Sequence, residues 1–288
     1  MVGDLSSFLS KESFQFYNKH GIPYKRSYLF YGVPGAGKTS LLTAIAGKFK
    51  RNLCIMQPTD PRVTDDSLAE AIKEAPSRSI IVLEDVDALF GKNRDTKNPK
   101  MNISFSGLLN ALDGVSNPDG QVFVLTTNFR ENLDSALIRN GRVDLHVHFS
   151  HATAEQIETL FLQFYPEDTA LAQPFREAVQ AELGDKPVNM AALQHFFIRQ
   201  MRTPAREVVA HVHTIVEDLN EKDAEASAEQ DAKGAEKKED DAGATAAAAT
   251  CATAGAAVPV APQSVVHVHV HAVAAAPVGA AEVRAQTQ

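Results

Sequence analysis

Short apolar runs recur along the first half of the chain, each bounded by Gly, Pro, Asn or Asp. They have the length and composition of single β-strands, and longer stretches between them have helical spacing. The apolar runs lie at residues 27–31, 53–57, 79–83, 121–126 and 145–149. The helical stretches lie at residues 38–50, 66–74, 103–112 and 134–139. This alternation predicts an α/β fold with a five-stranded parallel sheet flanked by helices.

The pattern changes near residue 151, after which only helical spacing is found. Leu193, Phe196 and Phe197 recur at intervals typical of a helix that packs on a core. The helices are expected at residues 153–164, 171–183, 189–201 and 204–219. We therefore expect an α/β subdomain over residues 26–150, followed by a small all-α lid over residues 151–219.

The two ends of the chain differ from this pattern. Residues 1–25 are polar with scattered aromatic residues, which fits either the remnant of an upstream region or a short amphipathic helix packed on the domain. Residues 220–288 are acidic at first and then rich in Ala, Val and Pro, a composition that predicts a disordered tail. Val–His alternation at residues 266–271 suggests an edge strand or weak metal binding, but with no further ligands nearby we expect no metal site.

Charge and cysteine content narrow the class of protein. The 288-residue chain has a net charge of −8, and most of it comes from the acidic stretch at residues 217–241. The rest is close to neutral, so no nucleic-acid partner is expected. The two cysteines, Cys54 and Cys251, suggest neither a disulfide framework nor a zinc site, which fits a reducing compartment such as cytosol or mitochondrial matrix. No signal peptide or transmembrane segment is recognised in the sequence.

A glycine-rich loop joins the first apolar run to the first helical stretch. It matches the P-loop pattern, with Gly32, Gly37, Lys38 and Thr39 at the required spacing. Such glycines let backbone N–H groups surround phosphates at a helix N-terminus, where the dipole favours anions. Lys38 is expected to reach the β- and γ-phosphates, and Thr39 to offer its hydroxyl to Mg²⁺. We interpret the segment as a nucleotide site rather than an ordinary turn, because a strand leads in and a helix leads out.

The third apolar run ends in acidic residues, Glu84 and Asp85. Acids at a strand end beside bound phosphates can hold the water shell of Mg²⁺ and polarise an attacking water. An apolar run that ends in acids is a weak signal alone. Together with the P-loop upstream, it indicates a site for hydrolysis of a nucleoside triphosphate.

A third segment holds an amide and two arginines. Asn128 ends a strand that we expect beside the P-loop strand, so its amide is placed to orient the water. Arg139 and Arg142 lie near the end of the next helix. Taken alone, two such arginines are more often solvated surface charges than functional groups.

Together these three segments resemble the AAA family of ring ATPases, and Arg139 to Arg142 is similar to its second region of homology. Residues 21–26, 83–88 and 106–115 look like the Bcs-type subfamily, chaperones associated with assembly of respiratory complex III in the mitochondrial inner membrane. The resemblance covers about residues 4–218. It implies ATP and Mg²⁺ as ligands, a homo-oligomeric ring, an unknown protein client, and a location at the matrix side of that membrane.

The resemblance also implies roles for individual residues. By this resemblance, Thr39 and Glu84 hold the metal and Asp85 is the catalytic base. Asn128 is a polar sensor, and Arg139 and Arg142 are arginine fingers that reach a neighbour's γ-phosphate. Most AAA proteins have Asp then Glu at the two acid positions, whereas Bcs-type proteins share the order found here. The positions that it gives to the phosphates are Gly32, Pro34, Gly35, Ala36, Gly37, Lys38, Thr39 and Ser40.

Several departures keep a second reading open. Full-length Bcs-type members have a transmembrane helix and a family-specific domain upstream of the ATPase module, and the sequence shows neither. The chain would then be a non-catalytic ATP-binding interaction module, a truncated paralogue of the enzyme. Residues 57–62 lack the aromatic loop with which AAA unfoldases grip polypeptide, so threading of unfolded chains is not expected. No Asn-Lys-x-Asp segment supports a GTPase.

Overall fold

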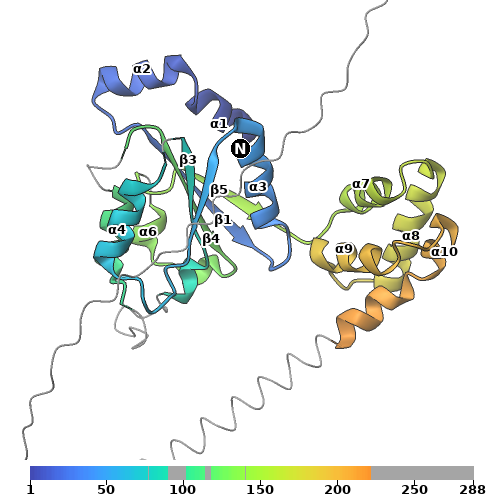
Figure 1. Cartoon of the computed structure of the whole chain (residues 1–288). Coiled ribbons are helices and arrows are strands. Elements are labelled where there is room, and N and C mark those ends of the chain that lie inside the picture. The colour runs from blue at the N-terminus through green and yellow to red at the C-terminus, as the bar shows by residue number, and fades with distance from the viewer. Residues whose placement is uncertain (77, 90–101, 114–117, 140, 222–288) are drawn as a thin grey trace, which may run out of the picture. The chain divides into compact units, whose positions relative to one another are not determined.

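The computed structural model (Figure 1) describes residues 1–76, 78–89, 102–113, 118–139 and 141–221. The chain forms two compact units that divide after Ser150. The tail expected over residues 220–288, with its Val–His alternation, falls almost entirely outside the described residues. No helix among the described residues has both the length and the apolar character that a bilayer crossing requires.

The first unit is built on a five-stranded sheet in which every strand pairing is parallel. The strands lie in the order β2-β3-β4-β1-β5, so the predicted sheet is confirmed. The strand that leads into the P-loop, β1, pairs with β4 and β5. The strands are β1 (Lys25–Gly32), β2 (Asn52–Met56), β3 (Ser79–Leu83), β4 (Gln121–Thr127) and β5 (Leu145–Phe149).

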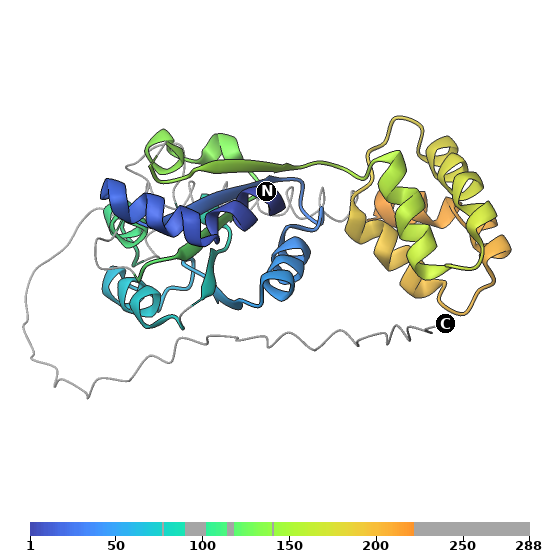
Figure 2. The same ribbon diagram turned by 90° about the horizontal axis from the view of Figure 1, so that it is seen from above.

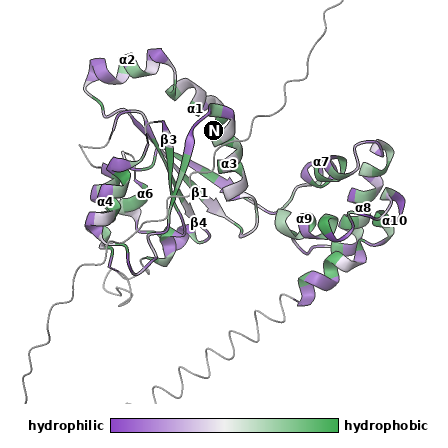
Figure 3. Ribbon diagram, viewed as in Figure 1, coloured by the Kyte–Doolittle hydropathy of each residue, from purple (hydrophilic) through white to green (hydrophobic). Residues whose placement is uncertain are grey.

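Helices cover both faces of this sheet, as Figures 1 and 2 show. Neighbouring residues of one strand point to opposite faces: Phe30 packs with one apolar cluster and Leu29 with the other. One face is covered by α1 (Val2–Phe8) and α3 (Lys38–Phe49), the other by α4 (Asp65–Glu74), α5 (Phe105–Asp113) and α6 (Ser135–Ile138). Apolar residues concentrate in the central strands, while the helices alternate between apolar and polar residues (Figure 3). Two short 3₁₀ helices follow β3 and β4, at Val86–Ala88 and Arg130–Asn132.

The N-terminal residues form two helices, α1 and α2 (Lys11–His20), of which α1 is anchored on the sheet. Leu5 is fully buried in the cluster around α3. Asp4 accepts hydrogen bonds from Arg26, at both Nε and a terminal nitrogen, and from the Tyr28 hydroxyl at 2.7 Å. Burial raises the pKa of Asp4, but these donors favour the carboxylate and hold its pKa below the ordinary value. The α1 helix thus packs on the domain, whereas α2 has no buried residue.

The second unit is the predicted all-α lid. Its core is aromatic: Phe161, Phe175 and Phe197 are fully buried and contact one another, with ring centroids 5.0–6.2 Å apart. Thr153 caps the first helix, accepting from the Gln156 backbone N–H, while the Gln156 side chain accepts from the Thr153 N–H. The helices are α7 (Ala154–Phe164), α8 (Ala172–Leu183), α9 (Met190–Arg199) and α10 (Ala205–Ala210), with a 3₁₀ turn at Thr169–Leu171 and a further helical segment over residues 213–221.

Two predicted helices differ from the structure. The single helix expected over residues 204–219 is wrong, because a turn at residues 211–212 divides it. There the His211 carbonyl accepts from both the backbone N–H and the hydroxyl of Thr214, at 3.0 and 2.9 Å, and the Ile215 N–H donates to Val212 instead of His211. The helix expected from residue 103 begins at Phe105, because the Ser104 hydroxyl caps it by accepting from the Gly107 N–H at 2.9 Å.

Candidate active site

The loop between β1 and α3 has a conformation that requires glycine at both its ends. Gly32 has φ 130°, and a Cβ there would overlap the Phe149 carbonyl oxygen of β5. Gly37 has φ 93° and is the N-cap of α3. Residues with a side chain rarely adopt such positive φ values. The backbone conformation of the loop therefore explains why the sequence has glycine at these two positions.

The N-terminus of α3 is open to an anion. Gly37 offers no side-chain cap, and the first turn holds no acidic residue. Thr39 and Ser40 in this turn are exposed, and Lys38 is half-buried. The first N–H groups of a helix lack intrahelical partners and sit at the positive end of the dipole. The loop and this first turn therefore fit a phosphate group.

Lys38 connects the loop to the end of β4. Its Nζ donates to the carbonyl oxygens of Gly32 at 2.9 Å and Val33 at 3.1 Å, and to Asn128 Oδ1 at 2.6 Å. Burial lowers the pKa of Lys38, while the nearby charges of Asp85 and Asp87 act to raise it. The lysine, the amide and the acids are thus brought together from three different strand ends. The expectation that Asn128 follows a strand beside β1 is confirmed.

The acids follow β3, two strands away from β1. Glu84 is half-buried and Asp85 is exposed. Asp85 has φ 50°, unusual for a residue with a side chain, and its backbone N–H donates to Thr126 Oγ1 at 3.1 Å. The Glu84 and Asp85 carboxylates and the Thr39 hydroxyl offer the hard oxygen donors that Mg²⁺ prefers, so the donor set fits that ion.

The two arginines have different surroundings. Arg139 immediately follows α6, and its side chain is exposed. The Arg142 side chain is only 13% exposed and stays within its own chain, where Nε donates to Asp113 at 2.8 Å. A terminal nitrogen of Arg142 also donates to the Ala136 carbonyl at 2.7 Å. Arg139 therefore keeps a guanidinium available to another molecule, whereas Arg142 braces α6 against the end of α5.

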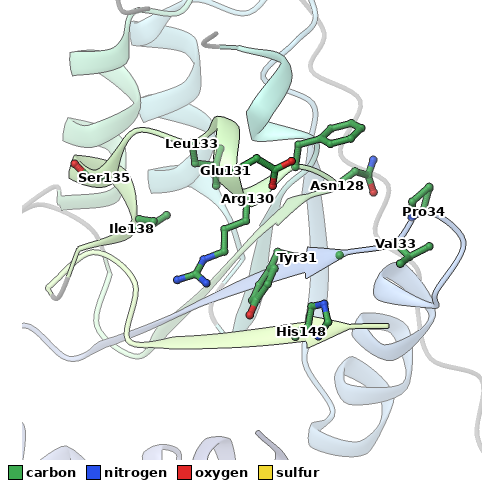
Figure 4. A pocket seen from close by; sticks show the side chains of 12 residues that line it. Tyr31, Val33, Pro34, Asn128, Arg130, Glu131, Leu133, Ser135, Ile138 and His148 are labelled. Carbon is green, nitrogen blue, oxygen red and sulfur yellow. The ribbon is translucent and has the colours of Figure 1, made fainter. Parts of the chain in front are cut away.

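A cavity of about 780 Å³ lies beside the loop, along the ends of β1, β4 and β5 (Figure 4). Its wall includes Gly32, Pro34 and Asn128 from the predicted site. It also includes three residues that were not predicted from the sequence, Tyr31, Arg130 and His148. The Arg130 guanidinium lies 4.9 Å from the centre of the Tyr31 ring, and the centres of the Tyr31 and His148 rings are 5.0 Å apart. These residues come from three separate segments, so spacing in the sequence carried no sign of their contact.

Comparison with known proteins agrees with this arrangement. The family described as ATPase family associated with various cellular activities (AAA) matches residues 28–151. The family described as Mitochondrial chaperone BCS1-like, ATPase lid domain, matches residues 154–214. The chain belongs to the AAA family and has a BCS1-like lid. The resemblance seen in the sequence is thereby confirmed, both for the α/β subdomain and for the helices that follow it.

The curated relatives of the chain include proteins named mitochondrial chaperones. It is 40% identical over 217 residues to the probable mitochondrial chaperone BCS1-A of Dictyostelium discoideum, covering 72% of this chain and 50% of that protein. It is 40% identical to mitochondrial chaperone BCS1 of Danio rerio, over 71% of this chain and 50% of the relative. It is 37% identical to the Homo sapiens protein of that name, over 71% of this chain and 49% of the relative. The chain thus spans about half the length of the curated relatives it matches.

Proposed function

We propose that this AAA protein binds and hydrolyses Mg-ATP in a homo-oligomeric ring, and uses the energy to drive conformational change in a protein client. The observation that carries the proposal is the meeting of Lys38 with Asn128, at 2.6 Å, within the electrostatic reach of Asp85. Phosphoryl transfer to water needs a cation that binds the phosphates, an amide that orients the water and a carboxylate that accepts its proton.

In this mechanism the loop binds the triphosphate. Backbone N–H groups of Gly35, Ala36 and Gly37, with those of the first turn of α3, donate to phosphate oxygens, while Gly32 and Pro34 shape the loop. Lys38 turns from its present carbonyl partners toward the β- and γ-phosphates. Thr39 and Glu84 would hold Mg²⁺, which when bound neutralises charge that develops on the phosphate oxygens. Ser40 contributes its backbone N–H to the same anion site.

The attacking water is handled by groups on β3 and β4. Asp85 accepts a proton from the water, and Asn128 accepts a hydrogen bond that fixes the direction of attack. Asp85 is shorter than a glutamate by one methylene, so the water must lie closer to the β3 end. The charge that develops on the transferred phosphoryl group requires a cation beyond Lys38.

We assign that cation to Arg139 of the neighbouring copy. The support is its exposed position at the end of α6, where another molecule can reach the guanidinium. Arg142, given the same role by family resemblance, is bonded to Asp113 and Ala136 within its own chain. It supports the proposed arrangement by holding α6, and it reaches a neighbour only if those bonds break.

The relatives' names extend the proposal to cell location and client. Proteins named mitochondrial chaperones match the chain over about 70% of its length, which supports a place in mitochondria for this protein too. We propose action at the matrix side of the inner membrane on a protein client. Because residues 57–62 lack an aromatic gripping loop, a folded client fits the proposal better than a threaded chain.

Phosphate release from ATP by the purified chain, with and without Mg²⁺, tests the proposal. Asp85→Asn should keep ATP affinity but lower turnover by about 10²–10⁴-fold, the usual contribution of a general base. Lys38→Ala should lose both affinity and turnover. Tight binding of a fluorescent ATP analogue with no Mg²⁺-dependent release in the unaltered chain would instead support a non-catalytic nucleotide-binding module.

A further inference from the structure

Two threonines at the end of β4 connect the proposed water-orienting amide to the proposed base. We propose that the Asp87–Thr127 pair is a positioning device: it fixes the backbone around Asn128 and locks it to the segment that carries Asp85. The inference rests on the proposed ATPase function and names residues that neither the sequence analysis nor the family resemblance assigned. In this proposal neither Asp87 nor Thr127 touches the reacting atoms.

Thr127 is the centre of this device. Its side chain is fully buried, although it is polar and lies at a strand end. The hydroxyl donates to Asp87 Oδ1 at 2.6 Å and accepts from the backbone N–H of Phe129 at 3.0 Å. A buried hydroxyl with both its donor and an acceptor site used is held in one rotamer. The backbone on both sides of Asn128 is therefore fixed by one side chain.

Thr126 makes the complementary contact. It is 4% exposed, and its Oγ1 accepts the backbone N–H of Asp85 at 3.1 Å. Successive residues of a strand point to opposite faces, so the two threonines hold the segment after β3 from both sides of β4. The Asp85 carbonyl in turn accepts from the Ala88 N–H at 3.0 Å, which closes the turn. These contacts hold Asp85 in its unusual φ of 50°.

The consequence is that Asn128 and Asp85 form one rigid unit. Both are proposed to act on the same water, and their separation is set by Thr126, Thr127 and Asp87 rather than by the nucleotide. Phe129, next to Asn128, is 52% exposed, so packing of its side chain does not hold this segment in place. A displacement of about 1 Å in such a constellation lowers turnover by about 10²-fold. Loss of the Thr127 hydroxyl should therefore affect the rate and leave ATP affinity unchanged.

The test compares Thr127→Val with Thr127→Ser. Valine keeps the shape of the side chain and removes the hydroxyl, whereas serine keeps the hydroxyl. We expect Thr127→Val to lower kcat by about 10–100-fold with KM for ATP within about twofold, and Thr127→Ser to restore most of the loss. Amide hydrogen exchange gives a reading that does not depend on hydrolysis: the Phe129 N–H should exchange faster in Thr127→Val than in the unaltered protein or Thr127→Ser.

Asp87 separates positioning from a direct chemical role. Asp87→Asn retains an oxygen that accepts from Thr127 but removes the charge, while Asp87→Ala removes both. Positioning predicts that Asp87→Asn keeps most of kcat and Asp87→Ala does not. Equal loss in both variants would assign Asp87 to charge or metal chemistry and overturn the proposal. Ser79→Ala, which removes a buried hydroxyl bonded to Pro76 at the opposite end of β3, is the control for stability alone and should leave kcat unchanged.

The outcomes separate this inference from the proposed function. If the unaltered chain binds but does not hydrolyse ATP, the proposed function fails, and exchange of the Phe129 amide still decides whether Thr127 fixes the segment. If the chain hydrolyses ATP and Thr127→Val does so at the same rate, the positioning role is wrong while the ATPase proposal stands. Should Thr127→Val fail to fold, the Asp87→Asn and Asp87→Ala pair carries the same comparison.

Discussion

Lys38 Nζ lies 2.6 Å from Asn128 Oδ1, so the P-loop lysine and the proposed sensor amide are direct hydrogen-bond partners. With the Gly32 and Val33 carbonyls, three protein oxygens surround the ammonium group. A triphosphate must compete with these oxygens for the same cation. ATP binding and release of the Asn128 amide are therefore coupled: the phosphate that takes Lys38 frees Asn128 to orient the water.

This coupling predicts an asymmetric effect of Asn128→Ala. The variant removes one competitor for Lys38, so ATP affinity should be unchanged or tighter. It also removes the amide that directs the water, so kcat should fall by about 10–100-fold. Parallel titration with a fluorescent ATP analogue and measurement of phosphate release provide the two numbers. Weaker ATP binding in Asn128→Ala would show that the amide contacts the ground-state nucleotide and does not compete with it.

The two arginines should separate into a functional and a structural residue. Arg139→Ala should leave the unfolding midpoint unchanged and lower turnover by about 10³-fold or more, as loss of an arginine finger does. Arg142→Ala removes a charged hydrogen bond to Asp113 and one to Ala136, and should cost about 1–3 kcal/mol of unfolding free energy. Denaturant unfolding and ATPase assays on both variants are the measurements. Equal destabilisation by the two variants would contradict this division.

The glycine at the start of the P-loop offers a matched pair of substitutions. Gly32→Ala places a methyl group against the Phe149 carbonyl at φ 130°, and should cost more than about 2 kcal/mol and abolish ATP binding. Gly47→Ala, in the interior of α3 with open space around the added atom, should stabilise by about 0.5–1 kcal/mol. Thermal unfolding of both variants decides. A stable Gly32→Ala protein that binds ATP would show that the loop has another conformation.

The Asp4 network should make the anchoring of α1 dependent on pH. Because hydrogen bonds from Arg26 and Tyr28 hold the folded pKa of Asp4 below 3.8, the carboxylate contributes stability above that pH. The contribution is lost as pH falls through the folded pKa. Asp4→Asn should thus cost about 1–3 kcal/mol at pH 7, with a difference that shrinks below about pH 4. Unfolding of both proteins from pH 7 to pH 3 measures it, and a constant difference would exclude the ionised carboxylate as the cause.

Local patterns in the sequence predict the sheet, the P-loop and the lid because each has a repeating or closely spaced signature. Alternation of strands and helices identified all five strands to within two residues at each end. Gly32 and Lys38 flank one loop that contains Gly37, and the strand before Asn128 does pair with β1.

The parts that could not be predicted depend on contacts between distant segments. The Asp4–Arg26 pair fixes α1, and the Thr127–Asp87 bond joins two strand ends, yet neither leaves a periodic trace in the sequence. The break at residues 211–212 was missed because the apolar spacing continues through it to Val212 and Ile215, both buried. The roles of Asp85, Arg139 and the other site residues remain predictions that the variants above examine.

The central claim is that each active site is completed by a second copy, and mixing two inactive variants tests it most directly. Lys38→Ala cannot hold ATP but still presents Arg139, while Arg139→Ala holds ATP but presents no finger. Each alone should be inactive. In a ring with head-to-tail interfaces, random assembly at equal amounts should restore turnover at about one quarter of the sites. Absence of any recovery at every mixing ratio, with co-assembly verified, would contradict shared sites.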